Sequence, residues 1–123
     1  MKILIVDDDS FLRDMYVTKF TESGHTVAAA TNGSEGLDCI KSKSFDVVLL
    51  DMVMPGMSGL DFLKNAVSQK PEAAETVFVV LSNQGEDTDK KAAKDAGAIG
   101  YIVKAESIPS DVVNKVEALC KKK

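Results

Sequence analysis

Polar or charged residues directly follow the five short apolar runs of this sequence. Thr31 and Asn32 follow the run 26–30, and the other four runs occupy residues 3–6, 46–50, 77–81 and 100–103. The residues that follow them offer carboxylates, a hydroxyl, an amide and an amine: Asp7, Asp8, Asp9, Asp51, Ser82, Asn83 and Lys104. In an open parallel sheet, ligands bind outside the carboxyl ends of the strands. If the runs are neighbouring strands, these side chains gather at one edge of a sheet.

Carboxylates at neighbouring strand ends predict a bound cation. Adjacent strands lie about 4.8 Å apart, so ionised Asp7, Asp8 and Asp51 would repel one another without a counter-charge. Oxygen ligands with no histidine or cysteine among them favour Mg²⁺ over zinc. Lys104, from another strand end, would offset part of the same negative charge.

Asp51 combines a rigid position with a group that can react. It follows the apolar run 46–50, which would hold it at the rim of the sheet. Carboxylates act as nucleophiles, and phosphoryl transfer depends mainly on positioning and charge neutralisation. Mg²⁺ and Lys104 would supply the neutralisation, and Ser82 a hydrogen bond to a phosphoryl oxygen. Asp51 is therefore a candidate phosphoacceptor.

Each of these residues, taken alone, has a simpler interpretation. A single aspartate after a strand is usually a turn or helix-cap residue. Ser82 alone would be interpreted as a cap, and Lys104 alone as a solvated side chain. Within the acidic run, Asp9 or Ser10 is the expected N-cap of the next helix. The joint placement at several strand ends is what favours a phosphorylation site at Asp51.

Five apolar runs alternate with longer amphipathic segments along the chain, the remaining run being 26–30. The runs ILIV, VVLL and VFVVL are continuously apolar and mostly β-branched, which is typical of strands covered on both faces. The alternation predicts an α/β fold with a parallel sheet. We expect one domain over residues 1–123, a doubly wound, five-stranded, flavodoxin-like (βα)5 sheet with strand order 2-1-3-4-5.

Capping signals mark the helices between these runs. Asn32 followed by Glu35 predicts a capping box, and Ser58 with Asp61 forms a weaker version of the same signal. The fourth helix, expected over 87–96, has alanines as its only apolar residues. It should bury little area and belong to the less stable part of the fold.

Composition disfavours several other classes of protein. A length of 123 residues fits one domain, and no run approaches the roughly 20 apolar residues of a membrane span. The net charge of -4 disfavours nucleic acid as a direct partner. The start of the chain is unlike a secretory signal, and Cys39 and Cys120 fit a reducing, cytoplasmic setting. His25, the only histidine, belongs to no metal or catalytic motif and is expected to be a surface loop residue.

The motifs together resemble the receiver domains of bacterial two-component response regulators. The matching segments are ILIVDDDS (3–10), DVVLLDMVMPGMSGLDFL (46–63), VVLS (79–82) and AGAIGYIVK (96–104). Each motif alone is weakly specific, but their joint spacing is highly specific. The resemblance implies that Asp7 and Asp8 form the acidic pair of a Mg²⁺ site. Asp8 would bind the metal directly, and Asp7 through water.

The same resemblance assigns roles at the other strand ends. It implies that Asp51 accepts the phosphoryl group and also binds the metal, with the backbone carbonyl of Val53 as a further ligand. Ser82 would be the switch hydroxyl, Lys104 the lysine that contacts the phosphate, and Tyr101 the switch aromatic.

The family's mechanism implies the partners. A sensor histidine kinase or a histidine phosphotransfer protein would donate the phosphoryl group, and the domain would catalyse its own dephosphorylation rather than turn over an external substrate. Ser82 would move toward the phosphoryl group and Tyr101 would turn inward. The surface of the fourth helix, fifth strand and fifth helix would then regulate a downstream protein or form a phosphorylation-dependent homodimer. The domain could act alone or within a longer regulator.

The chain departs from the family where proline commonly follows the lysine, in a cis bond. Ala105 occupies that position here, and a cis bond before a residue other than proline costs roughly 2.5–4 kcal/mol. We therefore expect a trans Lys104–Ala105 bond and a more mobile loop over 105–107.

Three further positions bear on how long a phosphoryl group would stay. Asn83 stands where the family favours a small residue and narrows the approach to Asp51. Val53 and Gln84 occupy two positions that tune dephosphorylation across the family. Val53 cannot orient an attacking water molecule, although Gln84 could. We therefore expect a phosphorylated state that lasts minutes or longer.

Two rival functions share some of these features. A haloacid-dehalogenase-like phosphatase also uses an aspartyl phosphate, and Asp7 and Asp9 have its D-x-D spacing, but Phe11 stands where that family needs threonine or valine. A pseudo-receiver would signal as a binding module without phosphate. The complete set of acidic, hydroxyl and lysine residues argues against it.

Overall fold

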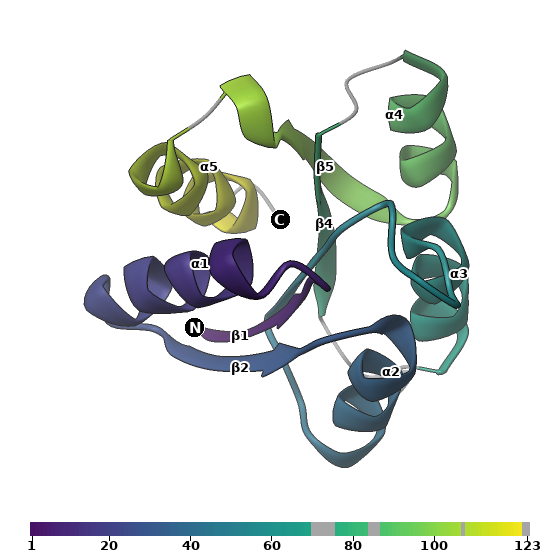
Figure 1. The fold of residues 1–123 in the computed structure, drawn as a ribbon, viewed down its shortest axis with the longest axis horizontal. Helices are drawn as coiled ribbons and strands as arrows, with labels where there is room; N and C mark the ends of the chain where they lie inside the picture. Colours follow the sequence, from purple (N-terminus) through teal and green to yellow (C-terminus); the bar gives the residue numbers. More distant parts are fainter. Residues whose placement is uncertain (70–75, 84–86, 107, 122–123) are drawn as a thin grey trace.

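The computed structural model describes residues 1–69, 76–83, 87–106 and 108–121. Its centre is one five-stranded parallel sheet in the order β2-β1-β3-β4-β5 (Figure 1). The predicted fold class and strand order are confirmed. The strands are β1 Lys2–Val6, β2 Thr26–Ala30, β3 Val47–Leu50, β4 Val77–Ser82 and β5 Ala98–Val103. The helices are α1 Ser10–Glu22, α2 Gly33–Ser42, α3 Gly59–Gln69, α4 Asp87–Asp95 and α5 Pro109–Lys121.

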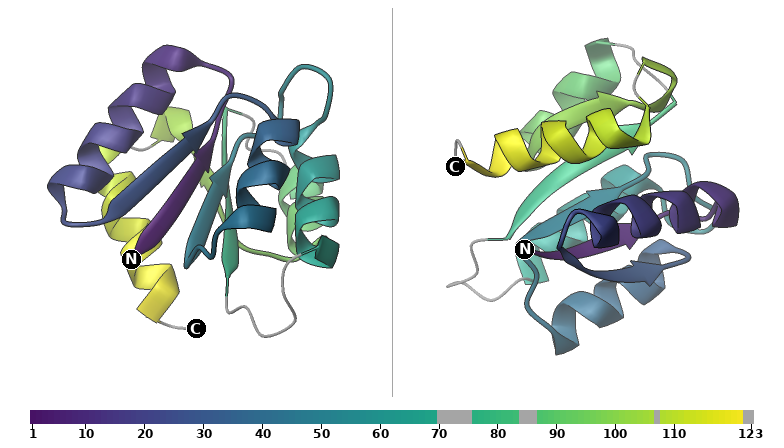
Figure 2. Two further views of the ribbon diagram at one scale, coloured as in Figure 1. Left: turned by 90° about the horizontal axis from the view of Figure 1, so that it is seen from below. Right: turned by 90° about the vertical axis from the view of Figure 1, so that its left-hand side faces the viewer.

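Helices cover both faces of the sheet, as the continuous apolar runs predict. Helices α1 and α5 lie on one face, and α2, α3 and α4 on the other (Figure 1 and Figure 2). Alternate residues of the central strands enter two separate cores. Leu4 and Leu50 pack with residues of α2 and α3, whereas Ile5 and Leu49 pack with residues of α1 and α5. Each such buried side chain contributes about 1.5–3 kcal/mol, which holds the strand ends rigidly.

Strand β5 begins earlier than the predicted run 100–103. The ladder pairs Phe78 with Ala98 and Val79 with Gly100. Ile99 is therefore bypassed by a bulge and is 42% exposed. A bulge of this kind breaks the apolar pattern locally, which is why the sequence pattern placed the start of the strand too late.

The predicted helix caps are confirmed, with one difference. Asp9 caps α1 by accepting a hydrogen bond from the backbone N–H of Leu12 at 3.1 Å. Asn32 caps α2 by accepting from the N–H of Glu35 at 2.9 Å. The Glu35 carboxylate, however, accepts from the N–H and hydroxyl of Thr31, at 2.8 and 2.6 Å. In a capping box the Glu35 carboxylate would accept from the N–H of Asn32. The observed hydrogen bond therefore comes from a residue one position earlier than predicted.

Helix α4 has the thin apolar face that its sequence predicts. Ala93 is its buried residue, whereas α5 buries Val112, Val113 and Val116. Among the residues that the structure describes, no helix has the length and apolar character needed to cross a membrane.

His25 lies in the loop between α1 and β2, as predicted, but it is half-buried rather than on the surface. Its side chain is 10% exposed, and its Nε2 lies 2.8 Å from Glu117 Oε2 on α5. Its Nδ1 lies 3.1 Å from the backbone nitrogen of Met1, and its ring packs beside Phe20. Because Glu117 is 92 residues away in the chain, no local pattern indicates this contact between the α1–β2 turn and α5.

The segment after β5 agrees with the predicted backbone. Every peptide bond in the described ranges is trans, including Lys104–Ala105. Residues Lys104–Glu106 form a short 3-10 turn before α5. Ser107, part of the loop predicted to be mobile, lies outside the described residues.

Candidate functional site

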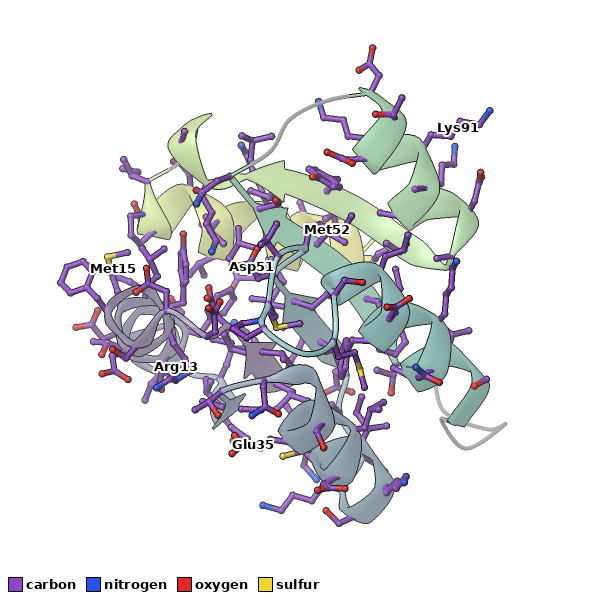
Figure 3. The ribbon with its side chains drawn as sticks, turned by 45° about the vertical axis from the view of Figure 1, so that its right-hand side comes forward. Arg13, Met15, Glu35, Asp51, Met52 and Lys91 are labelled. Carbon is purple, nitrogen blue, oxygen red and sulfur yellow. The ribbon has the colours of Figure 1, made fainter. Side chains whose placement is uncertain are left out.

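Four of the predicted site residues, Asp7, Asp8, Asp51 and Lys104, meet at the carboxyl end of the sheet; Asp51 is labelled in Figure 3. The parallel register pairs Val6 with Leu50, so Asp7 and Asp51 leave β1 and β3 side by side. The backbone N–H of Asp51 also donates to the carbonyl of Val6 at 3.1 Å. The sheet register itself therefore places the two carboxylates next to each other.

Three carboxylates form a cluster that could hold a metal ion. Oxygen atoms of Asp7, Asp8 and Asp51 all lie within 4.8 Å of one another. Asp7 is buried, Asp51 is half-buried and Asp8 is exposed. A donor set made of carboxylate oxygens fits a hard cation such as Mg²⁺. The exposed Asp8 leaves this cluster accessible from solvent.

Lys104 connects two members of the cluster. Its Nζ lies 2.9 Å from Asp7 Oδ2 and 3.3 Å from Asp51 Oδ2, and its side chain is 5% exposed. Burial lowers the pKa of Lys104, but the hydrogen bond to Asp7 and the charges of both carboxylates outweigh it, so the net pKa is raised. The amine therefore stays charged at neutral pH.

Asp7 and Asp8 have different surroundings. Asp7 accepts from the Lys104 amine at Oδ2 and from the Asp9 N–H at Oδ1, at 2.9 Å each. Both oxygens of Asp7 are thus engaged within the protein, whereas the Asp8 carboxylate faces solvent. The direct and water-mediated metal-ligand roles of Asp8 and Asp7 stay predictions.

Asp51 lies in an environment that opposes its ionisation. Burial raises its pKa, and the Asp7 charge adds to this, whereas Lys104 and the N–H of Val53 act in the opposite direction. The Val53 N–H donates to Asp51 Oδ1 at 3.3 Å. The net pKa is raised, so a bound cation would relieve an unfavourable charge.

The variant Asp51→Asn should therefore be more stable than the wild type in buffer without Mg²⁺. Because the pKa of Asp51 is higher in the folded chain than in the unfolded chain, stability falls as pH rises from about 3.9 through the folded pKa. At neutral pH only the wild type carries this cost, and below about pH 3.9 the difference should vanish. Urea unfolding at both pH values measures it.

Asp38→Asn, at an exposed position on α2, is the matched control and should leave the free energy of unfolding unchanged. An Asp51→Asn chain that is no more stable than the wild type at neutral pH would contradict the electrostatic account.

Ser82 and Tyr101 interact across the neighbouring strands β4 and β5. Ser82 ends β4 as a buried residue rather than following it, because it pairs with Val103 in the ladder. A side-chain hydrogen bond joins Tyr101 to Ser82. Burial raises the pKa of Tyr101, this hydrogen bond lowers it, and the charges of Asp89 and Asp51 raise it further. The two predicted switch residues are therefore linked physically.

Two of the three residues predicted to tune dephosphorylation lie within the described part of the chain. Val53 is 60% exposed, two residues after Asp51. Asn83 is exposed directly after Ser82. Gln84 lies outside the described residues. The role of the Val53 carbonyl as a metal ligand stays a prediction.

Two residues that shape the site were missed by sequence reasoning. A Cβ atom on Gly59 would overlap the backbone carbonyl oxygen of Asp51 and lie 2.6 Å from Met52 Cα. The M-P-G-x-x-G motif contains this glycine, but its spacing alone does not show why glycine is needed. Arg13 donates from Nη1 to the carbonyl oxygen of Asp7 at 2.9 Å, and it stands at no strand end.

The model of the response regulator receiver domain family matches residues 3–117. The chain belongs to this family. It is 36% identical over 121 residues to the chemotaxis protein CheY of Thermotoga maritima, covering 98% of both chains. It is 35% identical over 104 residues to the two-component response regulator PhoP of Pseudomonas aeruginosa, covering 85% of this chain but 45% of PhoP.

The receiver fold is also seen in solved structures. The chemotaxis protein CheY4 of Vibrio cholerae superimposes with a TM-score of 0.88 at 28% identity, covering 96% of this receiver domain and 97% of CheY4. Family membership is consistent with a phosphorylation-dependent switch that interacts with histidine kinases and effectors. It also favours the receiver interpretation over the phosphatase.

Proposed function

We propose that this receiver domain is a signalling switch that accepts a phosphoryl group on Asp51 from a histidine kinase or a histidine phosphotransfer protein. The observation that supports this most directly is the arrangement around Asp51. Its carboxylate lies beside the Lys104 amine and clusters with two further carboxylates, one of them open to solvent. A single strand-end aspartate would not need this arrangement.

The proposed roles follow the surroundings of each residue. Asp8, Asp51 and the carbonyl of Val53 would hold Mg²⁺ directly and Asp7 through water, and the metal would neutralise charge on the phosphoryl oxygens. Asp51 attacks phosphorus while the bond from phosphorus to the histidine nitrogen breaks. The charged Lys104 and the Ser82 hydroxyl then donate hydrogen bonds to phosphoryl oxygens, where charge develops.

The proposed output runs through the link between Ser82 and Tyr101. Tyr101 lies on β5 and lines a groove of about 360 Å³ together with Lys90 of α4 and Leu119 of α5. Movement of Ser82 toward a phosphoryl group would break its bond to Tyr101 and let the ring turn inward. Helix α4 has few buried contacts to resist this change. The α4–β5–α5 surface would then bind a downstream protein or a second copy, in the cytoplasm.

Beryllium fluoride, a phosphoryl analogue that coordinates an aspartate carboxylate without transferring a phosphoryl group, tests this proposal. Addition to the wild type with Mg²⁺ should shift backbone NMR resonances around Asp51, Ser82 and Tyr101. Asp51→Asn, or omission of Mg²⁺, should abolish the shifts. A wild type that does not respond would instead support a pseudo-receiver, which binds its partner without phosphate.

The phosphorylated state should be long-lived, because exposed Val53 places an aliphatic side chain beside Asp51. Such a side chain cannot orient an attacking water molecule. We expect a lifetime of minutes or longer, and Val53→Asn should shorten it several-fold by providing a hydrogen-bonding group. Val53→Leu, which stays aliphatic, is the control. Loss of the phosphoryl group from the wild type within seconds would reject this expectation.

A further inference from the structure

Arg13 connects helix α1 to the loop that bears the predicted metal ligands. Its side chain is partly buried, and its Nη1 donates to the carbonyl oxygen of Asp7 at 2.9 Å. This carbonyl belongs to the peptide group between Asp7 and Asp8. Arg13 therefore holds the main chain between two members of the carboxylate cluster, and this hydrogen bond does not involve their carboxylates.

The other bonds of Asp7 do not replace this contact. The Asp7 N–H donates to the carbonyl of Ala30 at 3.2 Å, and its carboxylate is held by Asp9 and Lys104. These bonds fix the peptide group before Asp7, the Asp7 side chain and the peptide group between Asp8 and Asp9, but not the one between Asp7 and Asp8. A peptide group is planar, so holding the Asp7 carbonyl also sets the direction in which the chain enters Asp8. Asp8 is exposed, so its orientation depends strongly on its backbone.

The guanidinium lies on the α2 side of this loop. The pKa of Glu35 is lowered, chiefly by its two hydrogen bonds from Thr31 and to a smaller extent by the charge of Arg13. Figure 3 shows Arg13 of α1 and Glu35 of α2 on the same side of Asp51. Arg13 thus lies within electrostatic reach of Glu35 on α2, while its hydrogen bond goes to the main chain of the loop.

We propose that Arg13 is a positioning residue that sets the affinity of the site for Mg²⁺ by fixing the peptide group between Asp7 and Asp8. This inference rests on the proposed Mg²⁺ site. Groups that orient metal ligands are typically worth about 10–100-fold in metal affinity. A cation near a metal site also repels the metal. The Glu35 carboxylate, which interacts with the Arg13 charge, offsets part of this repulsion, and we expect the loss of orientation to dominate.

Isothermal titration of Mg²⁺ into the phosphate-free domain tests this role with Arg13→Met, which removes both charge and donor. The Kd for Mg²⁺ should rise about tenfold. Phosphorylation by acetyl phosphate should need more Mg²⁺ but approach the wild-type rate at saturation. Arg13→Lys keeps a cationic donor and should lie between the two. Lys19→Gln removes a charge from the exposed last turn of α1 and should bind Mg²⁺ like the wild type.

The positioning role would be overturned by unchanged or tighter Mg²⁺ binding in Arg13→Met, together with a Kd for Mg²⁺ in Arg13→Lys equal to that of the wild type. Thermal unfolding in a chelator shows whether Arg13→Met is misfolded. If it is, the Kd of Arg13→Lys for Mg²⁺ decides: a value above that of the wild type supports the positioning role, and an equal value overturns it. Absence of Mg²⁺ binding by the wild type would instead overturn the proposed function itself.

Discussion

Replacement of Lys104 by methionine should lower the free energy of unfolding by about 3 kcal/mol in buffer without Mg²⁺. The amine is the cation between Asp7 and Asp51, at 2.9 and 3.3 Å. Methionine fills similar space but leaves the buried Asp7 carboxylate without this counter-charge. Uncompensated buried charge is among the most destabilising changes in proteins. Urea unfolding with and without Mg²⁺ measures the effect, and the added dication should restore part of the loss.

Lys104→Met should also slow phosphorylation of Asp51 by about 10²-fold, the usual effect of losing a single donor to developing charge. Lys91→Met is the matched control, because Lys91 is exposed on α4 (Figure 3). It should change neither stability nor phosphorylation. A Lys104→Met chain as stable as the wild type, with an unchanged rate, would show that the buried amine has neither role.

Gly59→Ala should destabilise the fold and displace the site, even though it adds only one methyl group. The new Cβ would overlap the carbonyl oxygen of Asp51 and lie 2.6 Å from Met52 Cα. These are backbone atoms, which cannot rotate away as a side chain can. The Gly59 N–H also donates to the Met52 carbonyl at 2.8 Å, so relief requires the loop after β3 to move. We expect a loss of about 3 kcal/mol in unfolding free energy.

The same displacement should reduce phosphorylation by about 10²-fold, since a shift of about 1 Å in a reacting group has that effect. Gly100→Ala is the matched control. Its added methyl would meet Leu119 Cδ1 at 2.5 Å, but this atom is the end of a side chain that can rotate. Gly100 also lies away from Asp51. Phosphorylation at the wild-type rate by a stable Gly59→Ala chain would refute the steric account.

The sequence predicted much of the fold and of the site because both depend on local patterns. Continuous apolar runs identified strands covered on both faces, and parallel pairing then required their ends to share one edge. Asp7, Asp51 and Lys104 were recognisable because each directly follows such a run. The same logic placed Ser82 one residue beyond the strand that in fact includes it.

The contacts that sequence reasoning missed join residues far apart, or depend on close packing. His25 meets Glu117 across 92 residues. The need for glycine at position 59 comes from a backbone approach that only the folded loop creates. Arg13 lies inside α1, where an arginine is usually interpreted as solvated, and its bond to the Asp7 carbonyl depends on how α1 leaves the sheet. The bulge at Ile99 interrupts the apolar pattern of β5, and this hid the start of the strand.

The most direct test of the central claim is incubation with acetyl phosphate, followed by intact-protein mass spectrometry. The account predicts that the wild type gains a single phosphoryl group with Mg²⁺ and none in a chelator. Asp51→Asn should gain none under either condition. Equal labelling of the wild type and Asp51→Asn, or no labelling of the wild type with Mg²⁺, would contradict phosphoryl acceptance at Asp51.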